Sequence, residues 1–429
     1  MRKPALFTIL AASLLAQAPP KSIHPRVKQT VDAISEERIA ATMRNLGTFG
    51  TRYVGTPGNA AARAWIVNEL KSYSPRLEAL EETWTVNPMP RMTGAQDVVN
   101  IVAVLPGKSR PETQILIVSH HDTVAYLGRG GGSPSGNLSD KAPGVVDNGS
   151  GVAATMELAR VMSQQEFDKT LVFAIFSAEE QGLVGATLHA QTAKAEKRRI
   201  EAVLNNDIMG SDLAGNGFRA THAIRVFSGE PMDSPSRSLA RYIKETGERY
   251  VPEMRVDAIF RADRFGRGGD HTPFHQRGYA AVRFTAPAEH YQNQHSVNDN
   301  FENSSPAYTT RVTRVNAAAA ASLALAPAPP QLSALGRGAT QYDAVPRWKS
   351  DSPEADLAGY ALLLRSTAAP YWEREIYAGK VNEYTLKNLS IDEVVIGVKA
   401  YDNEGLESLA AVYATPERPA RDVEGAVKK

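Results

Sequence analysis

The feature that most constrains this chain is an apolar run that ends in two adjacent glutamates. Residues 171–176 read LVFAIF, and Glu179 and Glu180 follow within a few residues. A run that is apolar at every position is typical of a strand buried on both faces of a parallel sheet. Open α/β sheets bind ligands just beyond the carboxyl ends of their strands. The two glutamates therefore stand where such a sheet binds a ligand or metal, although a solvated loop is the simpler explanation for this stretch alone.

Strand-like and helix-like segments alternate through most of the chain. This order predicts an α/β fold in which a mostly parallel central sheet has helices on both faces. We expect helices over 35–46, 57–73, 147–162, 234–246 and 307–325. We expect strands over 81–86, 98–105, 114–119, 170–177, 202–206 and 282–284. The stretch 128–144, which is rich in Gly, Ser and Pro, predicts a mobile loop.

The sequence changes character at an APAPP linker over 326–330. Short strands are expected beyond it, over 342–348, 359–365, 383–389 and 394–401. They predict a small β-sandwich over 331–415, attached to an α/β domain over 22–325. The charged residues 416–429 are expected to form a disordered tail.

The N-terminus has the layout of an export signal. Arg2 and Lys3 precede an apolar stretch over 5–16, and Ala16-Gln17-Ala18 is a small-x-small cleavage site. We therefore expect residues 1–18 to be removed and the protein to be exported, to the periplasm or the extracellular space. An anchored N-terminus is the alternative, but the apolar stretch is short for a membrane span, and no other stretch qualifies.

Charge balance and cysteine content exclude several classes of function. The 48 Lys and Arg residues nearly balance the 47 Asp and Glu residues, so neither a nucleic-acid partner nor an anionic membrane is indicated. The chain contains no cysteine, which excludes disulfides and thiolate-bound zinc. Any metal ion must be bound by His, Asp and Glu.

Candidate metal ligands of these types stand at expected strand ends or in loops: His120, Asp147, Glu180, Asp207 and His295. Because strand-end loops converge on one edge of a parallel sheet, these distant residues can lie close together. Two histidines and three carboxylates suit a pair of zinc ions bridged by one carboxylate. Two metals about 3.5–4 Å apart can hold a hydroxide between them and polarise a carbonyl. The spare Glu179 would then be the general base that moves the water proton to the leaving amine.

Six motifs resemble, in order, those of the zinc exopeptidases, the family of the secreted bacterial leucyl aminopeptidases and glutamate carboxypeptidase. They are SHHDT (119–123), PGVVDNGSG (143–151), FSAEEQGLVG (176–185), NNDIMG (205–210), GGDHTPF (268–274) and QHSVNDNFEN (294–303). Each motif is weak alone, but six in order with compatible spacing form a strong signal. The resemblance covers residues 35–325 and implies the phosphorylase/hydrolase-like fold of these enzymes.

The resemblance implies two zinc ions per chain. His120 and Asp207 would bind one ion. Glu180 and His295 would bind the other, and Asp147 would bridge the two.

The resemblance also implies the residues around the metals. Glu179 would be the base, and Asp122 would accept the second ring proton of His120. The peptide after the bridging aspartate is cis in the family, so we expect a cis bond between Asp147 and Asn148.

Two other histidines compete for the ligand positions. His121 adjoins His120, and neighbouring residues of a strand face opposite sides, so only one of them can point at the site. The H-x-D pattern favours His120. His295 is favoured over His290 because Asp299 follows it at four residues, as in the family.

The sequence departs from the family at two places. The stretch from 120 to 147 is longer than in the compact aminopeptidases. The entrance to the metal site and the size of the substrate therefore need not match those of these enzymes. In glutamate carboxypeptidase a tyrosine precedes the last histidine and helps to hold the oxyanion, whereas this chain has Gln294. Tyr291 and Arg264 are the remaining candidates for that role.

The C-terminal sandwich resembles a fibronectin type III domain. Trp348 and the VKAYDNEG run (398–405) support the resemblance, although Val394 and Val395 stand where a tyrosine corner is expected. Such a domain would act as a spacer or contact protein or cell-surface material.

The expected activity is that of an exported di-zinc aminopeptidase acting on peptides or proteins. A carboxypeptidase or dipeptidase on the same scaffold is the nearest alternative, with Arg261, Arg264 or Arg267 binding the substrate carboxylate. A glutaminyl cyclase, an acyltransferase with a single zinc, and a metal-free binding module are further alternatives. The full set of five ligands argues against both.

Overall fold

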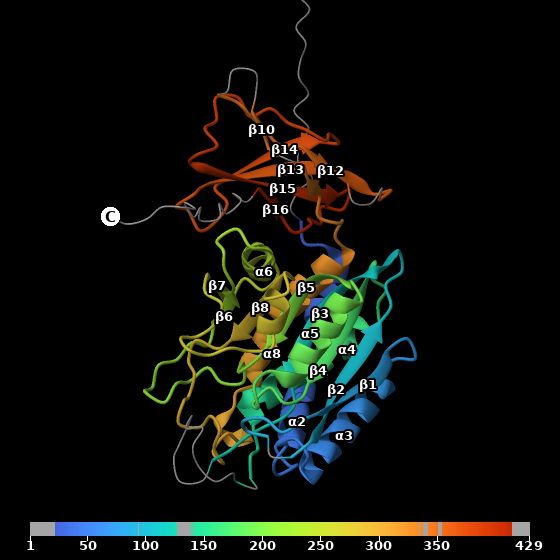
Figure 1. Cartoon of the computed structure of the whole chain (residues 1–429), viewed down its shortest axis with the longest axis vertical. Coiled ribbons are helices and arrows are strands. Elements are labelled where there is room, and N and C mark those ends of the chain that lie inside the picture. The colour runs from blue at the N-terminus through green and yellow to red at the C-terminus, as the bar shows by residue number, and fades with distance from the viewer. Residues whose placement is uncertain are drawn as a thin grey trace, which may run out of the picture. The chain divides into compact units, whose positions relative to one another are not determined.

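The computed structural model describes residues 22–92, 94–126, 139, 141–333, 335–337, 342–350 and 354–413. The signal expected at 1–18, the tail at 416–429 and most of the loop at 128–144 lie outside these residues. The chain divides into a larger unit that contains Ile23–Ala326 and a smaller one that contains Pro327–Ala410 (Figure 1).

An eight-stranded sheet forms the centre of the larger unit, with the strand order β1-β2-β4-β3-β5-β8-β6-β7. The strands are β1 Glu78–Val86, β2 Gln96–Leu105, β3 Arg110–His120, β4 Lys169–Phe176, β5 Arg199–Asn206, β6 Ala223–Ser228, β7 Arg255–Ile259 and β8 Ala281–Thr285. The four neighbours β4, β3, β5 and β8 run parallel, whereas β1, β2 and β6 pair antiparallel with their inner neighbours. The predicted mostly parallel sheet is therefore confirmed.

Helices flank this sheet, and their ends follow the capping signals in the sequence. They are α1 Pro25–Asp32, α2 Glu36–Leu46, α3 Pro57–Tyr73, α4 Ser150–Met162, α5 Val184–Ala195, α6 Pro235–Tyr250, α7 Thr272–His275 and α8 Pro306–Leu325. The side chains of Ser35, Thr56 and Ser234 accept hydrogen bonds from backbone N–H groups in the first turns of α2, α3 and α6. These caps satisfy donors that have no partner inside the helix.

Helices cover both faces of the sheet, as predicted. Leu116 and Val118 of β3 pack in one cluster with Ala186 and Ala190 of α5. Ser119 points the other way, since neighbouring residues of a strand alternate. Its hydroxyl accepts a hydrogen bond from Thr155 of α4 at 3.1 Å. Helices α4 and α5 therefore lie on opposite faces of β3.

The apolar run in β4 brings several chain segments to one edge of the sheet. Every residue of β4 is buried, because the strand lies between β2 and β3 in a sheet that helices cover on both faces. In the register of β3, His120 lies opposite Phe176 of β4, and Val118 lies opposite Asn205 of β5. Strands β3, β4 and β5 thus end side by side, and the polar residues that follow them emerge at the same edge.

Several elements of the larger unit carry weaker sequence signals, and our predictions omitted them: α1, α5, β6 and β7. Half of the buried residues of helix α5 are alanines, so the helix lacks a conspicuous apolar stripe. Strands β6 and β7 contain charged residues within short apolar segments. Among the residues that the structure describes, no helix is both long and apolar enough to span a membrane.

The smaller unit consists of short antiparallel pairings and one longer sheet. Strand β9 Gln331–Leu332 pairs with β12 Trp348–Lys349, and β10 Gly336–Arg337 pairs with β11 Ala344–Val345. Three strands of this unit form the longer sheet in the order β14-β13-β15, namely β13 Leu357–Ser366, β14 Arg374–Gly379 and β15 Val394–Asp402. The fourth strand of that sheet, β16 Ala411–Val412, begins directly after Ala410.

Two expectations for this unit are tested by these strands. Trp348 is buried, and its ring lies 5.5 Å from that of Tyr360, consistent with a core position. The strand predicted at 383–389 is wrong, because only isolated bridges at Glu383 and Leu386 occur there. Most side chains of residues 383–389 are polar, so this segment offers few apolar side chains to the core of a sheet. The likeness to fibronectin type III stays a prediction.

Candidate metal centre

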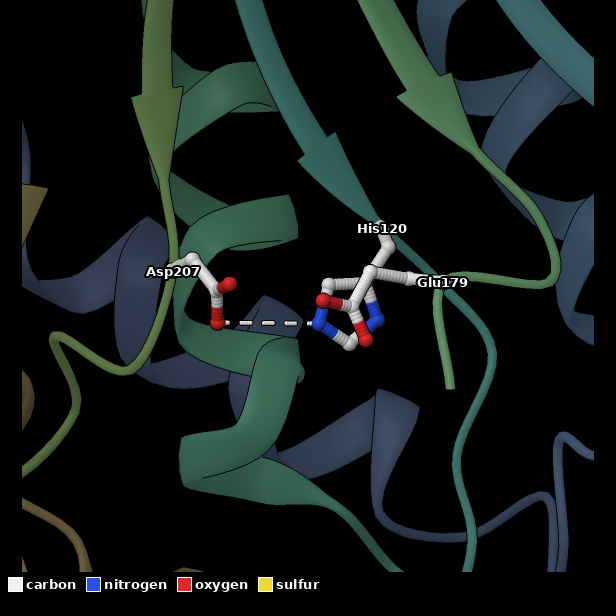
Figure 2. Close-up of side chains that lie close together, drawn as sticks. All are labelled: His120, Glu179 and Asp207. Atoms are coloured by element: carbon white, nitrogen blue, oxygen red, sulfur yellow. Dashed lines mark ion pairs between the residues drawn. The ribbon is translucent and has the colours of Figure 1, made fainter. Parts of the chain in front are cut away.

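Three polar residues from different strand ends form one candidate ligand group. His120 ends β3, Glu179 follows β4, and Asp207 follows β5. Figure 2 shows the three side chains turned toward one another. One ligand atom from each residue lies within 4.8 Å of the others, and His120 Nε2 is 3.6 Å from Asp207 Oδ1.

A second group consists of Asp147, Glu180 and His295, whose ligand atoms also lie within 4.8 Å of one another. His295 Nε2 is 3.1 Å from Glu180 Oε1. The three residues come from the segment before α4, the loop after β4 and the loop after β8. All five predicted ligands and Glu179 are therefore brought together.

Asp147 connects the two groups. Its Oδ1 is 3.4 Å from His120 Nε2, and its Oδ2 is 3.3 Å from His295 Nε2. One oxygen thus faces each group, which is the geometry that a bridging carboxylate requires. The peptide bond between Asp147 and Asn148 is cis, as predicted.

Asp122 joins the histidine of one group to both glutamates. Its Oδ1 lies 3.6 Å from His120 Nδ1, and the backbone carbonyl of Asp122 is closer to the same nitrogen, at 3.2 Å. The carboxylate also accepts hydrogen bonds from the backbone N–H groups of Glu179 and Glu180, both at 3.1 Å. Asp122 therefore fixes the turn that presents the two glutamates, a role that the sequence did not indicate.

Asp299 holds the backbone that carries Asp147. Its carboxylate accepts the N–H of Val146 at 2.7 Å and that of Asp147 at 2.9 Å. The backbone carbonyl of Asp299 accepts the N–H of Val145 at 3.0 Å. In the sequence Asp299 served only to mark His295, because a contact over 152 residues leaves no local pattern.

The competing histidines lie outside both groups. His121 is fully buried, and its Nε2 lies 3.4 Å from the carbonyl oxygen of Val99. Burial lowers the pKa of His121 to about 4, so the ring is neutral near pH 7. His290 belongs to neither of the groups found among the described residues.

Negative charge is concentrated at this edge of the sheet. Burial, together with nearby Glu180, Asp207 and Asp270, raises the pKa of Glu179 well above its usual range. Burial alone would lower the pKa of His295, but Glu180 and Asp147 raise it to about 11. Both shifts follow from burial together with the acids that surround each group.

The residues present fit divalent metal ions. The two groups offer imidazole nitrogens and carboxylate oxygens without thiolate, a donor set that zinc accepts. Asp207 Oδ1 is buried and has no hydrogen-bond partner, although such an atom normally finds one. A cation near that oxygen would satisfy it and would offset the charge of the buried acids.

A cleft of about 550 Å³ opens onto these groups. Its lining includes the acids Asp147, Glu179, Glu180 and Asp207, the arginines Arg91, Arg264, Arg267 and Arg283, and Tyr126, Tyr291, Gln294 and His295. Both candidates for holding an oxyanion, Tyr291 and Arg264, thus reach the cleft. Arg264 is already paired, since its Nη1 lies 2.7 Å from Glu289 Oε2.

Sequence reasoning missed Arg283, a buried residue of β8. Its Nη2 lies 3.1 Å from Asp207 Oδ2, and its Nη1 lies 3.0 Å from Asp263 Oδ2. The same Nη1 donates to the carbonyl oxygen of Gly268 at 2.8 Å. The sequence contained one signal for this residue, since an arginine stands within the apolar strand AVRFT. A guanidinium buried in such a strand requires acidic partners.

A parallel sheet with carboxylate and imidazole groups at its strand ends defines a class of metal-dependent hydrolases. The model of peptidase family M28 matches residues 100–320. A relative from Pyrenophora tritici-repentis, described as "Probable zinc metalloprotease", is 33% identical over 92% of this chain and 88% of its own length. The chain therefore belongs to peptidase family M28, and the protein is a peptidase.

Solved structures share the fold. The LapA aminopeptidase of Legionella pneumophila matches with a TM-score of 0.54 and 20% identity, over 72% of this chain and 78% of its own. The glutaminyl cyclase of Porphyromonas gingivalis matches with a TM-score of 0.52 and 18% identity, over 67% of this chain and 98% of its own. Because both sequence identities are low, these two similarities establish the fold but not the activity.

Proposed function

We propose that this protein is a di-zinc aminopeptidase. The observation that carries the proposal is the position of Asp147, whose two oxygens face His120 and His295 at 3.4 and 3.3 Å. A single carboxylate between two ligand groups suits a pair of metal ions better than one ion. The name of the LapA aminopeptidase, which shares the fold, is consistent with this activity.

In this proposal each ion has its own ligands. His120 and Asp207 would hold one zinc, Glu180 and His295 would hold the other, and Asp147 would be shared, since these side chains make up the two groups together with Glu179. Bound zinc would lower the pKa of a coordinated water and polarise the substrate carbonyl. The protein itself holds the metal ligands in position. Asp122 accepts a hydrogen bond from the backbone N–H of Glu180, and Asp299 accepts one from that of Asp147.

Glu179 is the proposed general base. Its carboxylate lies in the group with His120 and Asp207, and its pKa is raised by burial and by neighbouring acids. A carboxylate in this position can accept a proton from a bound water and return it to the leaving amine. Asp122 positions this residue through the hydrogen bond from the backbone N–H of Glu179.

A matched pair of substrates tests the aminopeptidase assignment. Peptides with a free N-terminus and the same peptides with an acetylated N-terminus are incubated with the full-length protein and zinc. We expect cleavage of the free peptides only, because an aminopeptidase must bind the terminal amine. Equal cleavage of both sets would contradict the assignment and would favour a carboxypeptidase.

The carboxypeptidase or dipeptidase alternative has specific support in the cleft. Arg264 and Arg267 line it, whereas Arg261 is not among the lining residues. A glutaminyl cyclase would share the fold but hold one zinc. Metal analysis of the purified protein separates these classes: we expect two zinc ions per chain, while one would favour a cyclase and none a binding module.

We further propose that the protein is exported and that residues 1–18 are removed. The support is the basic and apolar layout of the N-terminus. The mass of the protein secreted by a bacterial host tests this, since cleavage after Ala18 predicts a chain that begins at Pro19. The smaller unit is proposed to act as a spacer or to contact protein or cell-surface material.

A further inference from the structure

The charges that line the cleft fall into two sets. The four acids all belong to the two ligand groups, and the remaining charged side chains along the described lining, apart from His295, are arginines. Two of these arginines are neutralised. Arg264 is paired with Glu289 at 2.7 Å, and Arg283 is paired with Asp207 and Asp263.

Arg91 and Arg267 differ from this pair. Arg91 Nη1 donates to the carbonyl oxygen of Glu180 at 3.2 Å, and Arg267 Nη1 contacts Gln294 Oε1 at 3.5 Å. Both acceptors are uncharged, and within the described part of the chain neither guanidinium forms an ion pair. Both side chains are exposed to the cleft. Each therefore retains donors that a ligand can use.

The two arginines reach the same cleft from distant parts of the chain. Arg91 precedes β2, and Arg267 precedes α7. Arg91 contacts Glu180 itself, and Arg267 contacts the residue before His295. Both guanidiniums thus contact segments that carry ligands of the group of Asp147, Glu180 and His295.

We propose that Arg91 and Arg267 form an anionic subsite, so that the enzyme prefers peptides with a carboxylate beside the cleaved bond. This inference rests on the proposed peptidase function and narrows its substrate class. Guanidinium groups bind carboxylates through paired, charge-assisted hydrogen bonds. A lysine or arginine side chain would find no free acid along the described lining, because every acid there belongs to the ligand groups.

A carboxylate at this place has two chemical sources, a side chain or the C-terminus of a short peptide. Three matched pairs separate them: Leu-Glu-amide with Leu-Gln-amide, Glu-Ala-amide with Gln-Ala-amide, and Leu-Gln with Leu-Gln-amide. For at least one pair we expect kcat/KM of the charged member to exceed that of its neutral partner about tenfold or more, as a charge-assisted hydrogen bond provides. Ratios within about threefold in all three pairs would overturn the proposal.

Variants connect that preference to the two residues. In Arg267→Met and Arg91→Met, we expect the ratio of charged to neutral substrate to fall about tenfold, and Arg267→Lys should restore part of it. Arg261→Met is the matched control, since Arg261 lies in the same segment and is exposed but does not line the cleft. An unchanged ratio in both methionine variants, or an equal fall in the control, would overturn the assignment.

A binding measurement keeps this inference separate from the proposed activity. The same pairs are titrated calorimetrically into zinc-supplied Glu179→Gln protein, in which turnover is not needed. Tighter binding of a charged member that is lost in Glu179→Gln/Arg267→Met supports the subsite even if no peptide is cleaved. Cleavage without any charge preference in binding or rate would leave the peptidase function standing and refute the subsite.

Discussion

Asp147 Oδ1 lies 3.4 Å from His120 Nε2, and both residues are buried at the end of the sheet. The other oxygen of the same carboxylate faces His295. Two hydrogen bonds from the backbone at 146 and 147 to Asp299 hold this arrangement. A carboxylate fixed between two imidazoles is pre-organised to be shared by two metal ions.

The adjacent glutamates should have separable roles. Glu179→Gln is expected to retain both zinc ions and lose activity by several orders of magnitude, because the amide cannot accept the water proton. Glu180→Gln should instead weaken metal binding, since it removes a charged ligand. Metal content after dialysis and kcat are measured for both. Wild-type activity in Glu179→Gln would refute the assignment of the base.

Asp122→Asn tests how the glutamates are held. The carboxylate accepts two backbone N–H groups at 3.1 Å, whereas an amide offers one oxygen and turns its own donor toward the second N–H. We expect zinc affinity to fall about 10–100-fold, as for other residues that orient metal ligands. Competition with a chelator measures the affinity. Asp97→Asn, an exposed change on β2, is the control, and equal affinities in the two variants would contradict this role.

His121 should make the fold sensitive to acid. Burial lowers its folded pKa to about 4, against about 6.5 in an unfolded chain. Above about pH 6.5 the ring is neutral in both the folded and the unfolded chain, so His121 causes no loss of stability there. Below that pH the unfolded chain binds a proton that the folded chain does not, so stability falls as the pH falls toward 4, by about 3 kcal/mol in total.

The variant His121→Gln isolates this effect. Free energies of unfolding by urea are compared with wild type between pH 7 and pH 4, with a chelator present so that metal binding does not contribute. We expect the stability of wild type relative to the variant to decline over this range. Parallel pH profiles for the two proteins would show that His121 is not responsible.

Arg283→Met should be strongly destabilising. Arg283 is buried between Asp207 and Asp263, and removing one partner of a buried ion pair costs about 3–5 kcal/mol. Arg255→Met removes an exposed pair with Asp257 and should cost less than about 1 kcal/mol. Thermal unfolding measures both. Similar losses in the two variants would mean that the Arg283 pairs contribute little.

The sequence predicted those parts of the molecule that rest on local patterns. The continuous apolar run marked β4, and cap residues such as Ser35 marked helix starts. The motifs named every residue of the two ligand groups, because each of these residues follows a strand or lies in a loop whose place the fold determines.

What the sequence did not reveal depends on partners far away in the chain. Arg283 in an apolar strand indicates that acidic partners are needed, but only the fold identifies them as Asp207 and Asp263. Asp299 bonds to backbone 152 residues earlier, and Arg91 reaches a loop that follows another strand. Such contacts leave no periodicity, so only the assembled fold brings them together.

The most direct test is an anomalous difference map at the zinc absorption edge from crystals of the full-length protein. We expect two peaks, one on each side of the Asp147 carboxylate, the first beside His120 and Asp207 and the second beside Glu180 and His295. A single peak, or peaks remote from Asp147, would contradict the di-zinc account.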